Sequence, residues 1–361
     1  MTATRASYRG IPLYAPDRAP CRVDLSDNTN LWGMPPAAER ALRDATVASV
    51  TRYPALYADT LKRELAAYLG VAAECVVTGC GSDDVLDSAL RAVAAPGDRV
   101  AFPDPSFAMI PIFARLNGLE PVAVPLRGGT ALDADAMLAT GARVIYLCSP
   151  NNPTGNRLQA DAVERVVREA PGVVILDEAY AEFAAANHLA LLARSDRVLI
   201  VRTMSKAFGL AGLRIGYAAG APELVAEVEK SRGPYKVSSV AERTAVAALG
   251  HGLPWVREHA ALAIANRARL VGELQALGLR PLASDANFVL VPVPDAALTA
   301  ARLRAGGVAV RPFRALPAIG DALRISVGPW AMLAECLAAL PHALTGAVPH
   351  AAHAPAPTSA R

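Results

Sequence analysis

Three apolar runs in the middle of this chain each end in polar residues, and this pattern limits the folds that the chain can adopt. The runs begin at Val144, Val173 and Val198, and they lead into the segments SPNNPTG, DEAY and RTMSK. Short, uninterrupted apolar runs are typical of strands buried on both faces of a parallel sheet. Because open α/β sheets bind ligands at the carboxyl ends of their strands, the sequence predicts an α/β fold with a ligand site at that edge.

The third of these segments contains a lysine that we interpret as functional. Lys206 lies in the stretch RTMSKAFGLAGLRIGY, directly after the apolar run, and Arg214 follows it by eight residues. A lone lysine at such a place is usually a solvated surface residue. Here Asp177 and Asn152 follow the other two runs, and we therefore expect Lys206 to face them across the mouth of the sheet.

Composition excludes several classes of protein. The 361 residues are enough for a large core and two domains, and the formal net charge is only +3. Acidic and basic residues are interspersed, so we expect neither a basic nucleic-acid surface nor a nucleic-acid partner. The five cysteines form no CxxC pair, which argues against a disulfide framework or a metal site and favours the cytoplasm. No apolar stretch reaches the roughly 18 residues that a membrane span needs, and no signal peptide is visible.

A glycine-rich stretch before a predicted helix indicates a phosphate site. The segment TGCGSDD places Gly81, Ser82 and Asp83 where a helix begins, near Ser82. Free backbone N–H groups at a helix N-terminus bind anions. The alternatives are an incomplete dinucleotide motif, which lacks its third glycine, and an ordinary serine cap followed by acidic residues. Next to Lys206, the phosphate interpretation is favoured.

Periodicity and breakers predict the remaining elements. We expect helices over 35–50, 59–69 with Gly70 as the C-cap, 237–249, 255–277 and near 296–305, and a strand over 99–102. Alternating strands and helix-like segments between 109 and 166 indicate βαβ units. The Ala- and Pro-rich residues 346–361 are typical of a disordered tail.

The segments SPNNPTG, DEAY and SKAFGLAGLR, in this order, resemble the fold-type-I pyridoxal phosphate (PLP) aminotransferases. Within them the chain is most similar to the histidinol-phosphate aminotransferase family, from about Tyr14 to about Pro329. The resemblance implies a mostly parallel central sheet with helices on both faces and a smaller α/β C-terminal domain. The implied ranges are an arm with a small-domain segment (1–33), the large PLP-binding domain (34–277), the small domain (278–345) and the tail (346–361).

The resemblance also implies the residues that hold PLP. Lys206 would carry the cofactor, Asp177 would accept the ring N–H, and Tyr180 would bond to the ring's phenolate oxygen together with Asn152. Phe107 would stack on the ring. Tyr53 would reach the phosphate in a neighbouring subunit, which implies a homodimer with shared sites. The remaining implied cofactor-binding residues, at or near the phosphate, are Gly81, Ser82, Asp83, Thr203, Ser205 and Arg214.

Substrate residues follow from the same resemblance. Arg324 would clamp an α-carboxylate and Arg311 would grip a substrate phosphate, although a lone arginine is more often part of a surface ion pair. Thr29 and Leu31 stand where the family usually has Glu and Pro, which puts the substrate in question. The other expected substrate-binding residues are Tyr14, Asn28, Asn30 and Gly33.

Three functions share this set of residues. The first is amino transfer between histidinol phosphate, or an aromatic amino acid, and 2-oxoglutarate. The second is decarboxylation, as in the similar threonine-phosphate decarboxylases, which differ in the substrate pocket. The third is a PLP-sensing regulator, which would carry an N-terminal DNA-binding domain, whereas this chain starts almost directly at the catalytic arm. The sequence therefore favours an enzyme of the aminotransferase type.

Overall fold

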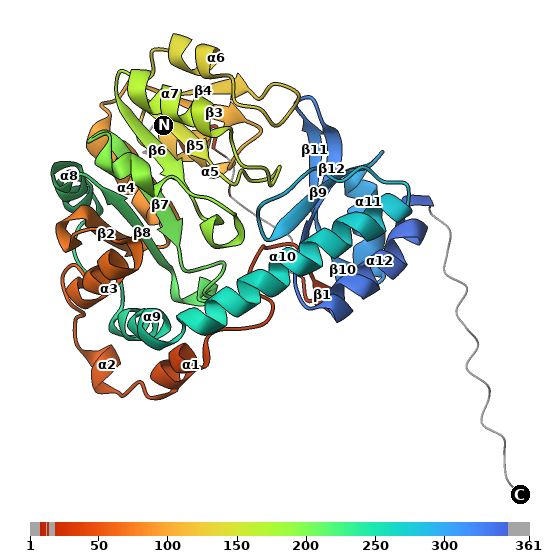
Figure 1. Ribbon diagram of the computed structural model, residues 1–361, viewed down its shortest axis with the longest axis horizontal. Helices are drawn as coiled ribbons and strands as arrows, with labels where there is room; N and C mark the ends of the chain where they lie inside the picture. The colour runs from red at the N-terminus through yellow and green to blue at the C-terminus, as the bar shows by residue number, and fades with distance from the viewer. Residues whose placement is uncertain (1–7, 12, 14–18, 346–361) are drawn as a thin grey trace, which may run out of the picture.

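A computed structural model describes residues 8–11, 13 and 19–345 of the chain (Figure 1). Tyr14, expected in the substrate site, and the expected tail 346–361 lie outside the described residues. No helix of the described part is both long and apolar enough to cross a membrane.

A seven-stranded sheet forms the centre of the larger part of the molecule. Its strands lie in the order β2-β8-β7-β6-β5-β3-β4, and all neighbours are parallel except β8, which is antiparallel to β2 and β7. The predicted α/β fold with a mostly parallel sheet is thus confirmed. The bounds are β2 Val76–Cys80, β3 Arg99–Asp104, β4 Glu120–Pro125, β5 Val144–Cys148, β6 Val173–Asp177, β7 Val198–Thr203 and β8 Ile215–Gly220.

The three apolar runs are the central strands β5, β6 and β7, and every residue in them is buried. Alternate side chains face opposite layers of the core. Tyr146 packs with helices α4, α5 and α8, whereas Ile145 and Leu147 pack with α6 and α7. Burial on both faces explains why these strands read as continuous apolar runs. The covering helices are α4 Ser82–Val93, α5 Met109–Leu116, α6 Ala134–Ala139, α7 Ala160–Glu169 and α8 Pro222–Arg232.

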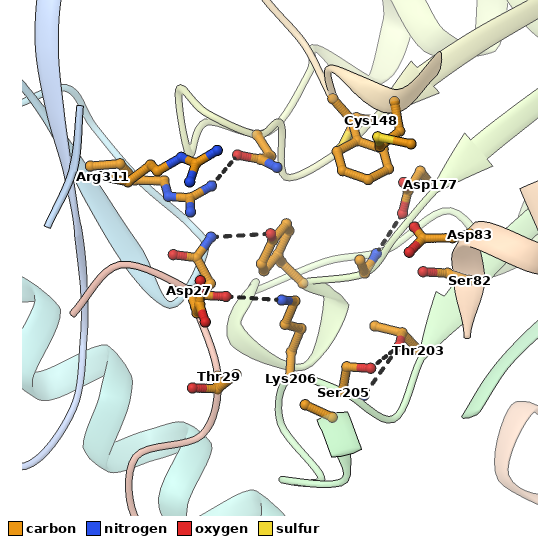
Figure 2. Close-up of a pocket in the computed structure, with 18 of the residues that line it drawn as sticks. Asp27, Thr29, Ser82, Asp83, Cys148, Asp177, Thr203, Ser205, Lys206 and Arg311 are labelled. Atoms are coloured by element: carbon orange, nitrogen blue, oxygen red, sulfur yellow. Dashed lines mark hydrogen bonds between the residues drawn. The ribbon is translucent and has the colours of Figure 1, made fainter. Parts of the chain in front are cut away.

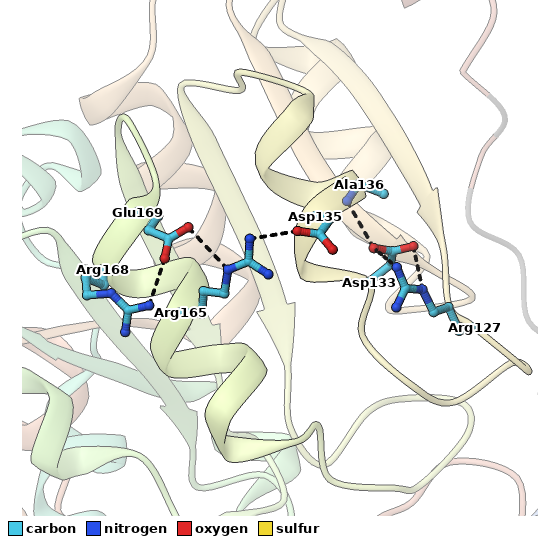
Figure 3. Close-up of polar contacts among 7 residues, drawn as sticks. All are labelled: Arg127, Asp133, Asp135, Ala136, Arg165, Arg168 and Glu169. Atoms are coloured by element: carbon cyan, nitrogen blue, oxygen red, sulfur yellow. Dashed lines mark hydrogen bonds and ion pairs between the residues drawn. The ribbon is translucent and has the colours of Figure 1, made fainter.

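Exposed ion pairs join two of these helices at the surface (Figure 3). Arg165 of α7 reaches Asp135 of α6 at 2.7 Å and Glu169 of its own helix at 3.3 Å. Asp133 caps α6 by accepting the N–H of Ala136 at 3.0 Å. Solvent screens such pairs, so they fix local geometry more than they stabilise the fold.

The C-terminal part builds a second, smaller α/β unit (Figure 1). Its sheet has the order β11-β12-β9 and is antiparallel, and β1 near the N-terminus pairs in parallel with β10. The long helix α10 runs from beneath the large sheet toward this unit. The domain limits given above remain predictions. The bounds are β1 Val23–Asp24, β9 Phe288–Pro292, β10 Val308–Ala309, β11 Arg311–Leu316, β12 Gly320–Ser326, α10 Leu253–Ala276, α11 Ala296–Ala305 and α12 Trp330–Thr345.

One expected helix is wrong in its extent. The segment 35–50 forms two helices, α1 Pro36–Arg43 and the short α2 Ala48–Thr51. Between them the Thr46 N–H donates to the Ser49 hydroxyl oxygen at 3.1 Å, and the two hydroxyl groups lie 3.1 Å apart. Such local side-chain bonds compete with the helical pattern of main-chain bonds and break it.

Other expected helices are confirmed to within a few residues. α3 spans Asp59–Leu69 and ends at Gly70, whose φ is +72°, and α9 spans Ser239–His251. α9 begins where the Ser238 side chain accepts the N–H of Ala241. The short 3₁₀ turns are η2 Ala73–Cys75, η3 Ala181–Phe183, η4 Leu189–Ala193 and η5 Ala211–Leu213.

Candidate active site

A cavity of about 590 Å³ opens at the carboxyl ends of β5, β6 and β7 (Figure 2). In the sheet, Cys148 pairs with Asp177, and Asp177 pairs with Val201, so the three strand ends lie side by side. This is the edge at which the sequence predicted a ligand site. The cavity is lined by Ser26, Asp27, Asn28, Thr29, Ser82, Asp83, Phe107, Met109, Cys148, Asn152, Asp177, Ala179, Tyr180, Thr203, Ser205, Lys206, Ala211, Arg214, Arg311 and Arg324.

Lys206 lies in the loop after β7, and its amine faces the cavity (Figure 2). Its Nζ donates to the carbonyl oxygen of Asp27 at 3.3 Å and lies 5.9 Å from the centre of the Tyr180 ring. Burial, followed by the positive charges of Arg324 and Arg214, lowers the pKa of this amine to about 8. A larger share of Lys206 is therefore neutral near pH 7, as a nucleophilic or proton-accepting amine must be.

Asp177 ends β6, lines the same cavity as the lysine and is almost completely buried. Its Oδ2 accepts the hydroxyl hydrogen of Tyr146 at 2.8 Å, and its Oδ1 accepts the N–H of Ala179 at 3.0 Å. Burial is the main cause that raises the pKa of this carboxyl to about 6, against the hydrogen bonds that lower it. A cationic ring N–H in the cavity would relieve that cost, because a buried carboxylate is stabilised by an opposite charge.

The N-terminus of α4 and Arg214 form the far wall of the cavity. Gly81 has φ +84°, a conformation that residues with a Cβ rarely adopt, and a Cβ here would also require the Arg214 guanidinium to move, so the position favours glycine. Arg214 Nη2 lies 3.5 Å from Asp83 Oδ2. The Ser205 hydroxyl oxygen accepts the Thr203 hydroxyl hydrogen at 3.0 Å. Helix N–H groups, a guanidinium and hydroxyls are the set that fits a phosphate.

Two arginines from the smaller sheet line the end of the cavity opposite the α4 N-terminus. Arg311 of β11 and Arg324 of β12 are paired in register, and both line the cavity. Arg324 donates from Nη1 to Asn152 Oδ1 and from Nη2 to the carbonyl oxygen of Ser26, both at 2.7 Å. Since Asn152 accepts through its oxygen, its NH₂ group remains the donor end of that side chain. The arrangement suits an anionic small molecule.

Four expected site residues do not line the cavity. Gly81 lies just behind it as the N-cap of α4. Asn30 donates to the carbonyl oxygen of Ala207 at 2.9 Å, and Gly33 meets Gly209 so closely that a Cβ on Gly209 would collide with it. Asn30 and Gly33 thus support the lysine loop from behind. Tyr53 is 84% exposed, and its ring contacts the ring of Tyr235 outside the cavity.

Several residues of the site carried no usable signal in the sequence. Tyr146 lies inside the apolar run of β5, where an aromatic residue is ordinary, yet its hydroxyl bonds Asp177. The acid next to Asp177, Glu178, accepts Arg202 Nη2 at 2.7 Å and the His188 N–H at 2.6 Å. Burial alone would raise the pKa of Glu178, but the bonds from His188 and Arg202 lower it. Lining residues that were not expected are Ser26, Asp27, Met109, Cys148, Ala179 and Ala211.

Comparisons with known proteins agree with this geometry. The family model described as aminotransferase class I and II matches residues 22–340. A histidinol-phosphate aminotransferase from Methylibium petroleiphilum is 40% identical over 335 residues, which cover 90% of each chain. An aromatic amino acid aminotransferase from Corynebacterium glutamicum is 38% identical over 319 residues, covering 86% of this chain and 92% of that protein.

A solved structure with a similar fold holds a ligand in its crystal. The histidinol-phosphate aminotransferase from Sinorhizobium meliloti in complex with pyridoxal-5'-phosphate has a TM-score of 0.88 at 27% identity, covering 96% of this chain and 98% of that one.

The lowered pKa of Lys206 leads to a test on the cofactor-free protein. The rate at which a small amine-reactive reagent labels Lys206, followed by peptide mass spectrometry against pH, should have its midpoint near pH 8. Arg324→Gln removes a positive charge that opposes protonation, so the midpoint should rise. Arg157→Gln is the control, because Arg157 pairs with Asp285 at 3.3 Å and does not line the cavity. Equal midpoints in all three proteins would contradict this electrostatic account.

Proposed function

This chain belongs to the class I and II aminotransferase family, and from that premise we propose that it is a PLP-dependent aminotransferase acting on histidinol phosphate and 2-oxoglutarate. The observation that carries the proposal is the placement of Lys206 and Asp177 in one cavity, between a phosphate-type wall and two arginines. Bound PLP supplies an aldehyde that holds the amino group and a protonated ring that withdraws electrons from the substrate's α-carbon.

Residues of the chain bind the cofactor and transfer the proton. The amine of Lys206 would hold the cofactor at rest and would then move the proton between the substrate's α-carbon and the aldehyde carbon of the cofactor. The carboxylate of Asp177 keeps the ring nitrogen protonated, and Phe107 stacks on the ring. Asn152 and Tyr180 bond to the ring oxygen. The phosphate contacts come from Ser82, Asp83, Thr203, Ser205 and Arg214, and Gly81 precedes them as the N-cap of α4.

Two guanidiniums at the substrate end support an anionic donor and acceptor. Arg324 matches an α-carboxylate, and Arg311 beside it matches a substrate phosphate or the second carboxylate of 2-oxoglutarate. Asn28 and Thr29 lie at the same end of the cavity. We place Asn30 and Gly33 behind the lysine loop as supports, and Tyr14 remains a proposed contact.

A second donor class, the aromatic amino acids, is favoured by two observations. The relative from Corynebacterium glutamicum is named as an aromatic amino acid aminotransferase. Phe107 and Met109 give the cavity an apolar portion that suits an aromatic ring. The relatives named above are all aminotransferases, which favours amino transfer over decarboxylation for this chain.

Substitution of Arg311 distinguishes a phosphorylated donor from an aromatic amino acid donor. If it binds a substrate phosphate, Arg311→Ala should lower kcat/KM for histidinol phosphate about ten- to a hundred-fold, as expected for loss of one charge-assisted bond. The loss should be small with phenylalanine or unphosphorylated histidinol. Arg314→Ala is the control, because Arg314 is an exposed arginine of the same strand. Equal losses with phosphorylated and unphosphorylated donors would mean that Arg311 acts only on the structure.

A homodimer is part of the proposal. Val47, Val50 and Tyr53 are 73–84% exposed, and the rings of Tyr53 and Tyr235 are in contact, with centroids 4.9 Å apart and planes tilted by 32°. Large apolar side chains gathered at a surface favour a protein partner. A second copy of the chain would cover them and receive Tyr53 at its own cofactor phosphate. All five cysteines are free, which supports the cytoplasm as the proposed location.

Hybrid dimers test the shared site. Tyr53→Ala and Lys206→Ala proteins should each be nearly inactive. Mixed after mild dissociation, they should recover activity, because one site of each hybrid then contains neither substitution. A mixture of Lys206→Ala with Asp177→Ala is the control, since both residues belong to the same subunit's cavity. Each site of that hybrid then carries one substitution, so the mixture should recover no activity. Confirmed exchange of subunits without recovery in the first mixture would contradict the proposal for Tyr53.

A further inference from the structure

Asn28 lines the cavity beside the active-site tyrosine, where three segments that are distant in the sequence contact its own. Its Nδ2 donates to the hydroxyl oxygen of Tyr180 at 3.2 Å. Its main-chain N–H donates to Ser326 Oγ at 2.8 Å, and Ser326 Oγ donates to Asn28 Oδ1 at 2.8 Å. Asn287 Nδ2 donates to the carbonyl oxygen of Asn28 at 3.0 Å. All four residues are at most 4% exposed, so these bonds have little competition from water.

These contacts fix which way the Asn28 amide points. The hydroxyl of Ser326 already accepts the main-chain N–H of Asn28, and its own hydrogen needs an acceptor in a buried place. Asn28 Oδ1 is that acceptor. If the amide were reversed, Ser326 Oγ would face two donors, and its hydrogen would lose this partner. The NH₂ group of Asn28 is therefore held toward Tyr180.

The direction of the amide sets the role of the tyrosine hydroxyl. Because the Tyr180 oxygen accepts a hydrogen from Asn28, its own hydrogen is left for an acceptor on the cavity side, which Tyr180 lines. Burial raises the pKa of Tyr180 above its ordinary value, so the hydroxyl keeps this hydrogen. Tyr180 is thereby prepared as a donor into the cavity.

We propose that Ser326, acting through Asn28, directs the hydroxyl hydrogen of Tyr180 toward the ring oxygen of the bound cofactor. Ser326 does not line the cavity, so it is a positioning residue. It ends β12 of the smaller sheet, whereas Tyr180 follows β6 of the large sheet. The donor is thus set only when the two parts are packed together. The inference rests on the proposed function, because it needs PLP in the cavity.

The pH dependence of the cofactor's visible absorbance tests this role. A hydrogen bond donated to the ring oxygen stabilises its negative charge and lowers the pKa of the lysine nitrogen that shares a proton with that oxygen. Ser326→Ala releases the amide and weakens the donated bond, so the midpoint pH should rise by about one unit, the order expected for one bond to a charged group. Ser326→Thr retains the hydroxyl and should restore the midpoint toward that of the wild type.

A double-substitution cycle separates positioning from general damage. Tyr180→Phe removes the donor and should itself raise the midpoint, and adding Ser326→Ala to it should give no further rise. Thr299→Val is the matched control, because the buried Thr299 donates to the carbonyl oxygen of Asp295 at 2.6 Å outside the cavity. It should lower stability without moving the midpoint. If Ser326→Ala does not fold, Asn28→Gly tests the same link, since glycine accepts the φ of +56° at this position.

The midpoint pH values of these variants test the inference about Ser326, and PLP binding by the wild type tests the proposed function. An unchanged midpoint in Ser326→Ala, or in Asn28→Gly where that variant is used, would overturn the inference. So would an equal rise from Ser326→Ala in the presence and absence of the Tyr180 hydroxyl. A wild-type protein that binds no PLP would refute the proposed function and the inference together, whereas a normal wild-type band with an unmoved variant midpoint would refute the inference alone.

Discussion

The site depends on three parallel strands that are buried on both faces. β5, β6 and β7 contribute only buried residues to the core, so their polar chemistry is confined to the carboxyl ends and the loops beyond them. Because β6 and β7 are hydrogen-bonded neighbours, their register alone places Asp177 next to the loop that carries Lys206. The smaller sheet then needs only to close the opposite side of one cavity.

Each buried charge around the cavity is held by specific partners. Asp177 is bonded by Tyr146 and a main-chain N–H, and Glu178 by Arg202 and His188. Burying a carboxylate is unfavourable unless such bonds replace water. The bonds do not cancel the cost at Asp177, whose pKa is raised. That residual cost favours a cationic group above the carboxylate, which is the electrostatic basis for binding a protonated ring.

The sequence was sufficient for the fold class and for most residues around the cavity. Apolar runs that end in DEAY and SPNNPTG identify the strand ends, because strand burial and strand direction together determine where the polar residues meet. The break at Thr46 was missed, since a hydroxyl pair competing with helix bonds has no periodic signature. Ser326 and Tyr146 were also missed, because an isolated serine or tyrosine in an apolar strand shows its bond only after folding.

The N-terminal segment shows a further limit of sequence patterns. Asn28 and Asn30 are separated by one residue, yet Asn28 bonds the active-site tyrosine and Asn30 bonds the main chain of the lysine loop. Asn28 is held with φ at +56°, a conformation that asparagine tolerates better than most residues. The pattern thus located the segment, while the division of roles within it depends on backbone geometry that the pattern does not encode.

The site of covalent attachment tests the central claim most directly. The chain has four lysines, Lys62, Lys206, Lys230 and Lys236, so the result is unambiguous. The protein would be incubated with PLP, reduced with borohydride and digested, and the modified peptide would be identified by mass spectrometry. We predict one stoichiometric adduct on Lys206. An adduct on any of the other three lysines in place of Lys206, or no adduct despite a folded protein, would contradict the account.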